Sequence, residues 1–258
     1  MNIEVDGLSV HYKESGAGEE TVVILQGWLA PCEVYDSIAQ LLAPSYHVIQ
    51  LDVPGLGASD EPAEPWNLDA YVDFFVRFVG LLGLGAVTLI GHSWGGRVII
   101  KLASRQNVPF AVNRIVLVDG AGIPRKRTPA EERRIRRYKI LKRVVEVPLI
   151  ARSFPDLIEA WRDSQGSADY RASSPTMRAT MVMSINEDLT PLLPNVAPET
   201  LLVWGANDED TPPSDGQLME RRMQNATLVT IQDAGHFSFL DQPAVFAGIM
   251  RAFFGLEV

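Results

Sequence analysis

The sequence predicts an α/β protein with a mostly parallel, doubly wound β-sheet that helices cover on both faces. Short β-branched runs alternate with longer segments whose apolar residues recur at helical spacing, which is the pattern of such a sheet. A chain of 258 residues is also a common size for a single α/β domain. The alternation stops at residues 123–197, where prolines separate helical patterns and no convincing strand occurs. We therefore expect one core, built from residues 1–122 and 198–258, with a helical insertion between its two parts.

Each element of the expected core has its own local signal. The expected elements are, in order, a hairpin turning at Asp6-Gly7, a strand at 21–25, a helix at about 33–43, a strand at about 46–51, a helix at 67–82, a strand at 86–90, a helix at 97–103 and strands at 115–118, 201–204 and 227–231. The helix at 67–82 carries an apolar stripe from Leu68 to Leu82, which we assign to the core.

A G-x-S-x-G motif occupies residues 91–95, between a short apolar strand and a helical pattern. A serine on such a strand-to-helix turn is held in a strained backbone conformation, and the flanking glycines let neighbouring elements approach closely. Its hydroxyl then stands near a helix N-terminus, where backbone N–H groups can stabilise an oxyanion. Ser93 is therefore the candidate nucleophile, and the alternative is a merely structural glycine-rich turn.

A nucleophilic serine needs a base, and the chain has only four histidines. His11 and His47 lie in predicted strands. His92 immediately precedes the serine, so we expect its side chain to point away and fill structure beneath the turn. His236 follows the last predicted strand, in a loop of the kind where catalytic residues are common. We predict that His236 is the general base.

Three aspartates are candidates for the acid that orients the histidine. Asp208 lies just past the strand at 201–204, Asp210 is two residues further on, and Asp119 ends the strand at 115–118. The acid would fix the imidazole tautomer and stabilise the imidazolium during reaction. We favour Asp208 and keep the other two as alternatives.

Together these motifs resemble the α/β-hydrolase fold superfamily, in its capped, carboxylesterase-like form with a Ser-Asp-His triad. The resemblance covers nearly the whole chain and is carried also by Leu25-Gln26-Gly27-Trp28, by the stretch 52–59, by Trp204-Gly205 and by Gly235-His236. It implies the chain order Ser93, Asp208, His236 and a helical cap inserted after the sixth strand. It also implies that the oxyanion hole consists of the backbone N–H groups of Trp28 and Trp94.

The oxyanion loop departs from many relatives, which have His-Gly where this chain has Gln26-Gly27. The implied oxyanion donors are backbone groups, so the loss of the histidine need not abolish the hole. The Gln26 amide could still hydrogen-bond to neighbouring loop backbone.

The composition indicates an ordinary soluble enzyme. No apolar run is long enough to span a bilayer and no secretory signal is present, so we expect a cytoplasmic protein that does not bind membranes. Cys32 is the single cysteine, which excludes an intrachain disulfide, and we interpret it as a packed thiol. Phosphate-binding loops and metal-ligand clusters are absent from the sequence, so we expect no cofactor and no metal. The sequence does not determine an oligomeric state.

The predicted cap contains a basic segment at residues 125–143, with ten lysines and arginines against two glutamates. The whole chain is acidic, with a net charge of −9, which argues against a nucleic-acid partner. We interpret the segment as an amphipathic cap helix with a solvated face; docking on the acidic core and attraction of anionic substrates are the alternatives. Some apolar residues of the cap should face the substrate, from among Phe154, Leu157, Trp161, Met177, Met181 and Met183.

These features predict a serine hydrolase that cleaves small or medium carboxylic esters through an acyl-enzyme intermediate. Carbon–carbon bond hydrolysis and perhydrolysis on the same triad are alternatives within the fold. Haloalkane dehalogenases and epoxide hydrolases are disfavoured, because those relatives have an aspartate where this chain has Ser93. A non-catalytic ligand-binding member of the fold is the alternative from a different functional class.

Overall fold

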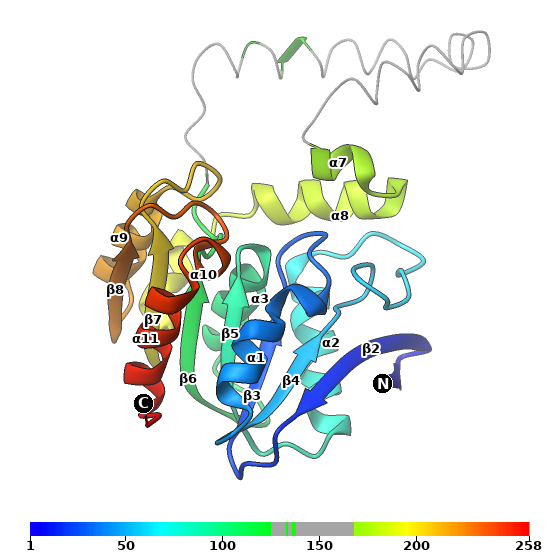
Figure 1. Cartoon of the computed structure of the whole chain (residues 1–258). Coiled ribbons are helices and arrows are strands. Elements are labelled where there is room, and N and C mark those ends of the chain that lie inside the picture. The colour runs from blue at the N-terminus through cyan, green and yellow to red at the C-terminus, as the bar shows by residue number, and fades with distance from the viewer. Residues whose placement is uncertain (125–132, 134–135, 138–167, 258) are drawn as a thin grey trace, which may run out of the picture.

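The core of the protein is an eight-stranded sheet, seen in a computed structural model that describes residues 1–124, 133, 136–137 and 168–257 (Figure 1). The strand order is β1-β2-β4-β3-β5-β6-β7-β8. The strands are β1 (Asn2–Val5), β2 (Leu8–Ser15), β3 (Thr21–Leu25), β4 (His47–Leu51), β5 (Ala86–His92), β6 (Ala111–Val118), β7 (Glu199–Gly205) and β8 (Ala226–Ile231). The β1–β2 and β2–β4 pairs are antiparallel and the five other pairs are parallel, which confirms the predicted sheet.

Helices cover both faces of this sheet. The described helices are η1 (Cys32–Tyr35), α1 (Asp36–Leu42), α2 (Leu68–Leu81), α3 (Trp94–Ala103), α7 (Ala168–Ala172), α8 (Pro175–Asn186), η2 (Thr190–Asn195), α9 (Pro213–Arg222), α10 (Ser238–Asp241) and α11 (Pro243–Phe254). One core cluster contains residues of α2, α3 and α9, and a second contains residues of α1 and α11. Alternate residues of β3 enter the two clusters, Val23 the first and Ile24 the second, as the strand period requires. Within the described ranges, no helix is long and apolar enough to cross a membrane.

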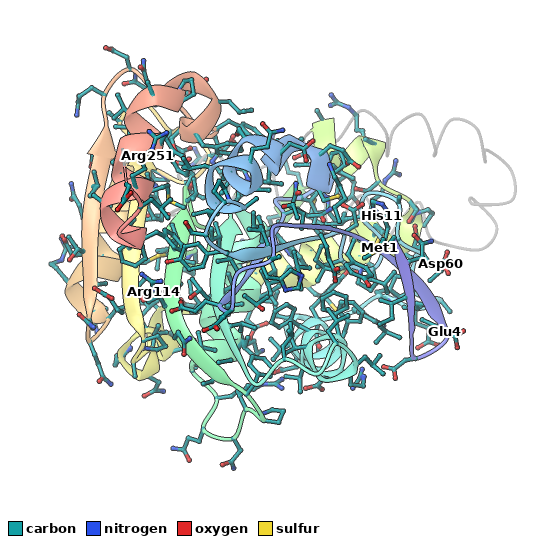
Figure 2. The ribbon with its side chains drawn as sticks, turned by 60° about the horizontal axis from the view of Figure 1, so that its bottom comes forward. Met1, Glu4, His11, Asp60, Arg114 and Arg251 are labelled. Carbon is teal, nitrogen blue, oxygen red and sulfur yellow. The ribbon has the colours of Figure 1, made fainter. Side chains whose placement is uncertain are left out.

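The predicted amino-terminal hairpin is present and turns where expected. Asp6 and Gly7 both have positive φ, 51° and 81°, the backbone that a two-residue hairpin turn with matching twist requires. β2 is then tied to the loop after β4, because the Ser9 N–H donates to Asp60 Oδ2 (2.8 Å) and the Asp60 N–H donates to the Ser9 carbonyl (2.9 Å). Figure 2 shows Asp60 on the same side of the molecule as Glu4 and His11 of the hairpin.

Of two predicted helices, the structure matches one closely and the other only in part. The helix predicted at 67–82 is α2, whose start is capped by the Asn67 side chain accepting from the Ala70 N–H at 2.9 Å. The helix predicted at 33–43 is instead the short 3₁₀ turn η1 followed by α1. The Cys32 N–H, at the start of η1, has no intrahelical partner and donates to the Asp52 carboxylate at 2.8 Å.

Residues 168–197 of the predicted insertion contain α7, α8 and η2, and of these α7 and α8 lie beyond the carboxyl ends of the parallel strands (Figure 1). α8 is fastened to the core where the Trp66 N–H donates to Thr180 Oγ1 at 3.0 Å, and Met177 and Met181 are buried beneath it. Most of the basic segment 125–143 lies outside the described residues, as do Phe154, Leu157 and Trp161. The domain boundaries stay predictions.

Candidate active site

The candidate site lies where the chain reverses its direction of travel across the sheet. β3 sits between β4 and β5, so the strands that follow it in sequence extend to opposite sides of it. In open α/β sheets, ligands bind beyond the carboxyl ends of the strands at such a switch point. The predicted oxyanion loop follows β3 and Ser93 follows β5, so the sequence-predicted residues meet at this end of the sheet.

Ser93 occupies the sharp turn between β5 and α3, with φ 48° and ψ −113°. Such a backbone is strained for a residue with a side chain and persists only where the surroundings fix it. The turn is fixed by close packing at both flanking glycines. A Cβ at Gly95 would lie 2.4 Å from the Leu25 carbonyl oxygen, and one at Gly91 would lie 2.6 Å from Ile99 Cδ1. The glycines of the motif therefore serve close approach, as the sequence indicated.

The structure brings the three favoured candidates into one hydrogen-bonded chain. Ser93 Oγ lies 2.8 Å from His236 Nε2, and His236 Nδ1 lies 2.8 Å from Asp208 Oδ2. The ionised carboxylate can only accept, so Nδ1 carries the ring proton and Nε2 is left free to accept from the serine hydroxyl. This is the tautomer in which the histidine can act as a base toward Ser93.

Electrostatics favour an ionised Asp208 beside a readily protonated His236. Asp208 is buried, which alone would raise its pKa, but hydrogen bonds from His236 and Thr211 hold the pKa below its ordinary value. Burial likewise tends to lower the pKa of His236, but the hydrogen bond to Asp208 and that carboxylate's charge raise it overall. The sequence analysis missed Thr211, which donates to Asp208 from both its N–H (3.0 Å) and its Oγ1 (2.8 Å).

The two alternative acids take other positions. Asp119 is buried after β6 and accepts from the Gly205 N–H at 2.7 Å and from Ser238 Oγ at 2.6 Å, not from the histidine. Burial raises the pKa of Asp119 to about 7. Asp210 is exposed, and its N–H donates to Asp208 Oδ1 at 2.8 Å. Of the three aspartates, only Asp208 contacts His236.

The two predicted oxyanion donors flank the serine. Within the described chain, the backbone N–H groups of Trp28 and Trp94 have no hydrogen-bond acceptor, and both residues line the same cavity as Ser93. The Trp94 N–H is at the first position of α3, where helical N–H groups have no intrahelical partner. The two indole rings pack edge to face with centroids 5.5 Å apart, which fixes the loop against the helix.

The expected role of Gln26 is wrong in one respect. Its side-chain amide is fully buried, but neither amide atom has a hydrogen-bond partner within the described residues. The loop is held instead by Tyr35, whose hydroxyl accepts from the Gly27 N–H at 2.8 Å. Tyr35 lies on η1 and belongs to neither the oxyanion loop nor the G-x-S-x-G motif, so no sequence signal pointed to it.

His92 fills structure beneath the turn, as expected, and also links the two halves of the site. Its Nε2 lies 2.8 Å from the His236 carbonyl oxygen, so Nε2 must be the protonated nitrogen. Nδ1 then accepts from the Tyr35 hydroxyl at 2.9 Å. Burial lowers the pKa of His92 to about 3, so the ring is neutral at ordinary pH. A hydrogen-bonded chain thus joins Gly27 in the oxyanion loop to the backbone of His236.

A cavity of about 1620 Å³ opens above these groups and is bordered by both core and α8 residues. Ser93, His236 and Trp94 line it, as do Met181 and Ile185 of α8. Met181 is thus one of the predicted apolar residues that does face the cavity, whereas Met177 packs in the core. The cavity is lined by apolar and by charged residues, the latter including Arg97, Asp215 and Arg221.

Two groups of described residues are close enough to share a metal ion, and neither fits one. Asp208, Asp210 and His236 are one group, and both ring nitrogens of His236 and the Asp208 carboxylate are already engaged with one another, with Ser93 and with Thr211. His11, Cys32 and Glu33 are the other. Burial raises the pKa of the Cys32 thiol to about 12, so it stays protonated, and His11 Nδ1 already pairs with Asp52. The interpretation of Cys32 as a packed thiol is confirmed, since its side chain is buried.

Comparison with known proteins places the chain in a family. The model of the Alpha/beta hydrolase family matches residues 22–249. The protein belongs to this family, which confirms the resemblance in the sequence, and it is a hydrolase.

Its relatives act on several kinds of bond. The chain is 27% identical to the pimeloyl-[acyl-carrier protein] methyl ester esterase of Nitrosomonas europaea, over 95% of this chain and 99% of that protein. It is also 27% identical to a 2-hydroxy-6-oxononadienedioate/2-hydroxy-6-oxononatrienedioate hydrolase of Escherichia coli, over 92% of this chain and 88% of that one. The solved enol-lactonase of Burkholderia xenovorans LB400 has the same fold, with a TM-score of 0.76 at 18% identity, covering 99% of this chain and 100% of that one.

Proposed function

We propose that the protein is a serine hydrolase that cleaves small or medium carboxylic esters through an acyl-enzyme intermediate. The observation that carries the proposal is the hydrogen-bonded chain from Ser93 Oγ through His236 to Asp208, with 2.8 Å at each step. The choice of an ester as the bond that is cleaved is supported by the Nitrosomonas europaea relative, which is named an esterase and which the match covers over 99% of its length.

In the first half of the reaction, Ser93 Oγ attacks the ester carbonyl carbon while its proton passes to His236 Nε2. The carbonyl oxygen becomes an oxyanion and accepts hydrogen bonds from the backbone N–H groups of Trp28 and Trp94. Asp208 stabilises the imidazolium that has formed. The tetrahedral intermediate then collapses, and the alkoxide leaves as alcohol after taking the proton from His236.

In the second half, water replaces the alcohol. His236 removes a proton from the water, the hydroxide attacks the acyl carbonyl, and a second oxyanion forms at the same N–H pair. Collapse of this intermediate releases the carboxylic acid and returns the proton to Ser93 Oγ. The hydrogen-bonded chain through His92 and Tyr35 keeps the histidine and the oxyanion loop in register through both halves.

The predicted cap would complete the pocket. Residues 123–197 are proposed to form it, with Met181 and Ile185 of α8 supplying apolar contacts above Ser93. Thioether side chains adapt to acyl groups of different shape.

A second candidate function is hydrolysis of a carbon–carbon bond on the same triad. It is favoured by the Escherichia coli relative, whose named substrate is an unsaturated oxo-dioate and not an ester. In this reaction the oxyanion N–H groups would bind the oxygen of the ketone carbonyl next to the carbon–carbon bond that breaks. His236 would transfer the protons.

Turnover of a panel of 4-nitrophenyl esters, next to a vinylogous 1,5-diketone, tests the two functions. We expect ester hydrolysis that rises and falls with acyl chain length and disappears in Ser93→Ala. Cleavage of the diketone with negligible ester turnover would favour the carbon–carbon reaction. If neither class is cleaved by the folded wild-type protein, the hydrolytic proposal is wrong.

A further inference from the structure

Arg97 is a buried positive charge one helical turn from the candidate nucleophile. It lies in the first turn of α3, which begins at Trp94 directly after Ser93. Its side chain is buried, with 5% of its surface exposed, and it lines the same cavity as Ser93 and His236. Burial lowers the pKa of Arg97 only to about 10, so the guanidinium is charged at neutral pH.

Only one of the three guanidinium nitrogens is used by the described protein. Nη1 donates to the carbonyl oxygens of Ser184 (2.9 Å) and Glu187 (3.0 Å) at the end of α8. Nε and Nη2 have no partner among the described residues, and no described carboxylate lies within 4 Å of Arg97. The nearby Glu187 carboxylate is paired with Lys101 instead.

The unused edge of Arg97 matches one kind of ligand. The Nε–H and Nη2–H groups are coplanar and parallel, which suits the two oxygens of a carboxylate bound side-on. The charges of Glu187, Asp188 and Asp215 act on Arg97, but none of these carboxylates binds its Nε–H and Nη2–H edge, and anchoring α8 requires only the Nη1 side of the group. A substrate carboxylate would accept from both unused donors.

We propose that Arg97 is a specificity-determining residue, and that the substrate carries a free carboxylate a few carbon atoms from the carbonyl that Ser93 attacks. The proposal rests on the serine-hydrolase function and names the substrate class for it. Arg97 acts in binding and takes no part in the bond-breaking steps.

Acidic residues in the same cavity moderate this preference: Asp169, Glu209, Asp210 and Asp215 all line it. Asp215, in the first turn of α9, lines the cavity; its N–H donates to the Pro212 carbonyl, and its carboxylate has no hydrogen-bond partner in the described chain. Burial raises its pKa to about 6, and it is coupled electrostatically to Arg97 and Asp208. Ionised Asp215 repels a substrate carboxylate at neutral pH, so Asp215→Asn should strengthen the preference for anionic substrates.

The test compares esters that differ only in charge. One pair is monomethyl glutarate and its primary amide, with the charge on the acyl side; the other is 4-acetoxybutanoate and its primary amide, with the charge on the alcohol side. The measurement is kcat/KM for both members at constant ionic strength. We expect wild type to prefer the anion in at least one pair by roughly tenfold to a hundredfold, the range for hydrogen bonds to a charged partner.

Arg97→Gln removes the charge and the two-donor edge, so the ratio of kcat/KM for the anion to that for the amide should fall to about one, whatever the variant does to either value alone. The matched control is Arg221→Gln, which removes an exposed arginine from the same cavity and should keep the preference. If Arg97→Gln does not fold, Arg97→Lys replaces it, since it keeps the charge but lacks the two-donor edge; the preference should shrink.

Two results would overturn the proposal. Wild type could show no preference in either pair, or Arg97→Gln could lower kcat/KM equally for anion and amide, as expected if Arg97 only anchors α8. Calorimetric binding of glutarate, compared between wild type and Arg97→Gln, decides the point independently of turnover. Absence of all ester hydrolysis, including that of 4-nitrophenyl butyrate, with glutarate binding that needs Arg97 would refute the hydrolase function and leave the carboxylate site standing.

Discussion

Replacing Asp208 by asparagine should disable the site while keeping its shape. Oδ1 of Asp208 accepts from the backbone N–H groups of Asp210 (2.8 Å) and Thr211 (3.0 Å), which are fixed donors. An asparagine must therefore place its carbonyl oxygen at that position and its NH₂ group at the position of Oδ2. The NH₂ group then lies against His236 Nδ1, which in wild type is 2.8 Å away as a donor.

The consequence is a change of tautomer. Nδ1 of His236 must now accept from the amide, so the single ring proton moves to Nε2 and points at Ser93 Oγ. The ring can no longer take the serine proton. Kcat should fall by about 10⁴, the loss that this substitution causes where a histidine is forced into the wrong tautomer.

The assay is steady-state hydrolysis of 4-nitrophenyl butyrate by folded Asp208→Asn, with Asp210→Asn and Asp119→Asn as matched controls. Asp210→Asn should be nearly silent. Asp119→Asn loses an acceptor for Ser238 and should cost about 1–3 kcal/mol of unfolding free energy, yet reduce kcat far less. A crippled Asp119→Asn beside an active Asp208→Asn would refute the reasoning and move the acid to the end of β6.

Three further outcomes are expected from the geometry. Because Asp208 raises the pKa of His236, kcat/KM should increase with pH as the imidazolium loses its proton, with a midpoint above about 6.5; a midpoint at or below this value would contradict the coupling. Tyr35→Phe leaves Nδ1 of His92 without its donor, so denaturant unfolding should show that the free energy of unfolding falls by about 1–3 kcal/mol. Kcat should change more than KM; an unchanged kcat would mean that the link is only structural. Gly95→Ala pushes a Cβ against a carbonyl oxygen 2.4 Å away and should lower stability by about 1–3 kcal/mol and ester turnover sharply; a fully active, equally stable variant would show that the turn can relax.

Local signals allowed much of the fold and the site to be predicted. The turn at Ser93 is specified by its own glycines and flanking strand, and α2 by its apolar stripe and the Asn67 cap. Such features depend on residues close together in the chain, so the sequence alone reveals them. The helices α9 and α11 also pack on the sheet but were not predicted.

The acid could not be chosen uniquely, because all three aspartates follow strand ends. The choice depends on the strand order, which places β7 beside β8 and so brings Asp208 next to the loop of His236. Asp119 is directed instead to Gly205 and Ser238, whose positions only the tertiary structure gives.

Tyr35 and Arg97 were missed for a similar reason. Each acts through a partner distant in sequence: Tyr35 joins the oxyanion loop to His92, 57 residues away, and Arg97 reaches the end of α8. Neither residue belongs to a motif, and a buried tyrosine or arginine has no periodic signal that separates a positioning role from packing.

The most direct test of the central claim is to trap the acyl-enzyme. The protein is mixed with 4-nitrophenyl acetate, quenched in acid while turnover continues, and digested for mass spectrometry, with Ser93→Ala treated in parallel. In wild type, the mechanism predicts an acetyl group on the peptide that contains Ser93. In Asp208→Asn the same acetyl group should form much more slowly, and Ser93→Ala should show neither adduct nor turnover. Undiminished ester turnover by folded Ser93→Ala, or an acetyl group that builds up and decays with turnover on another residue, would contradict it.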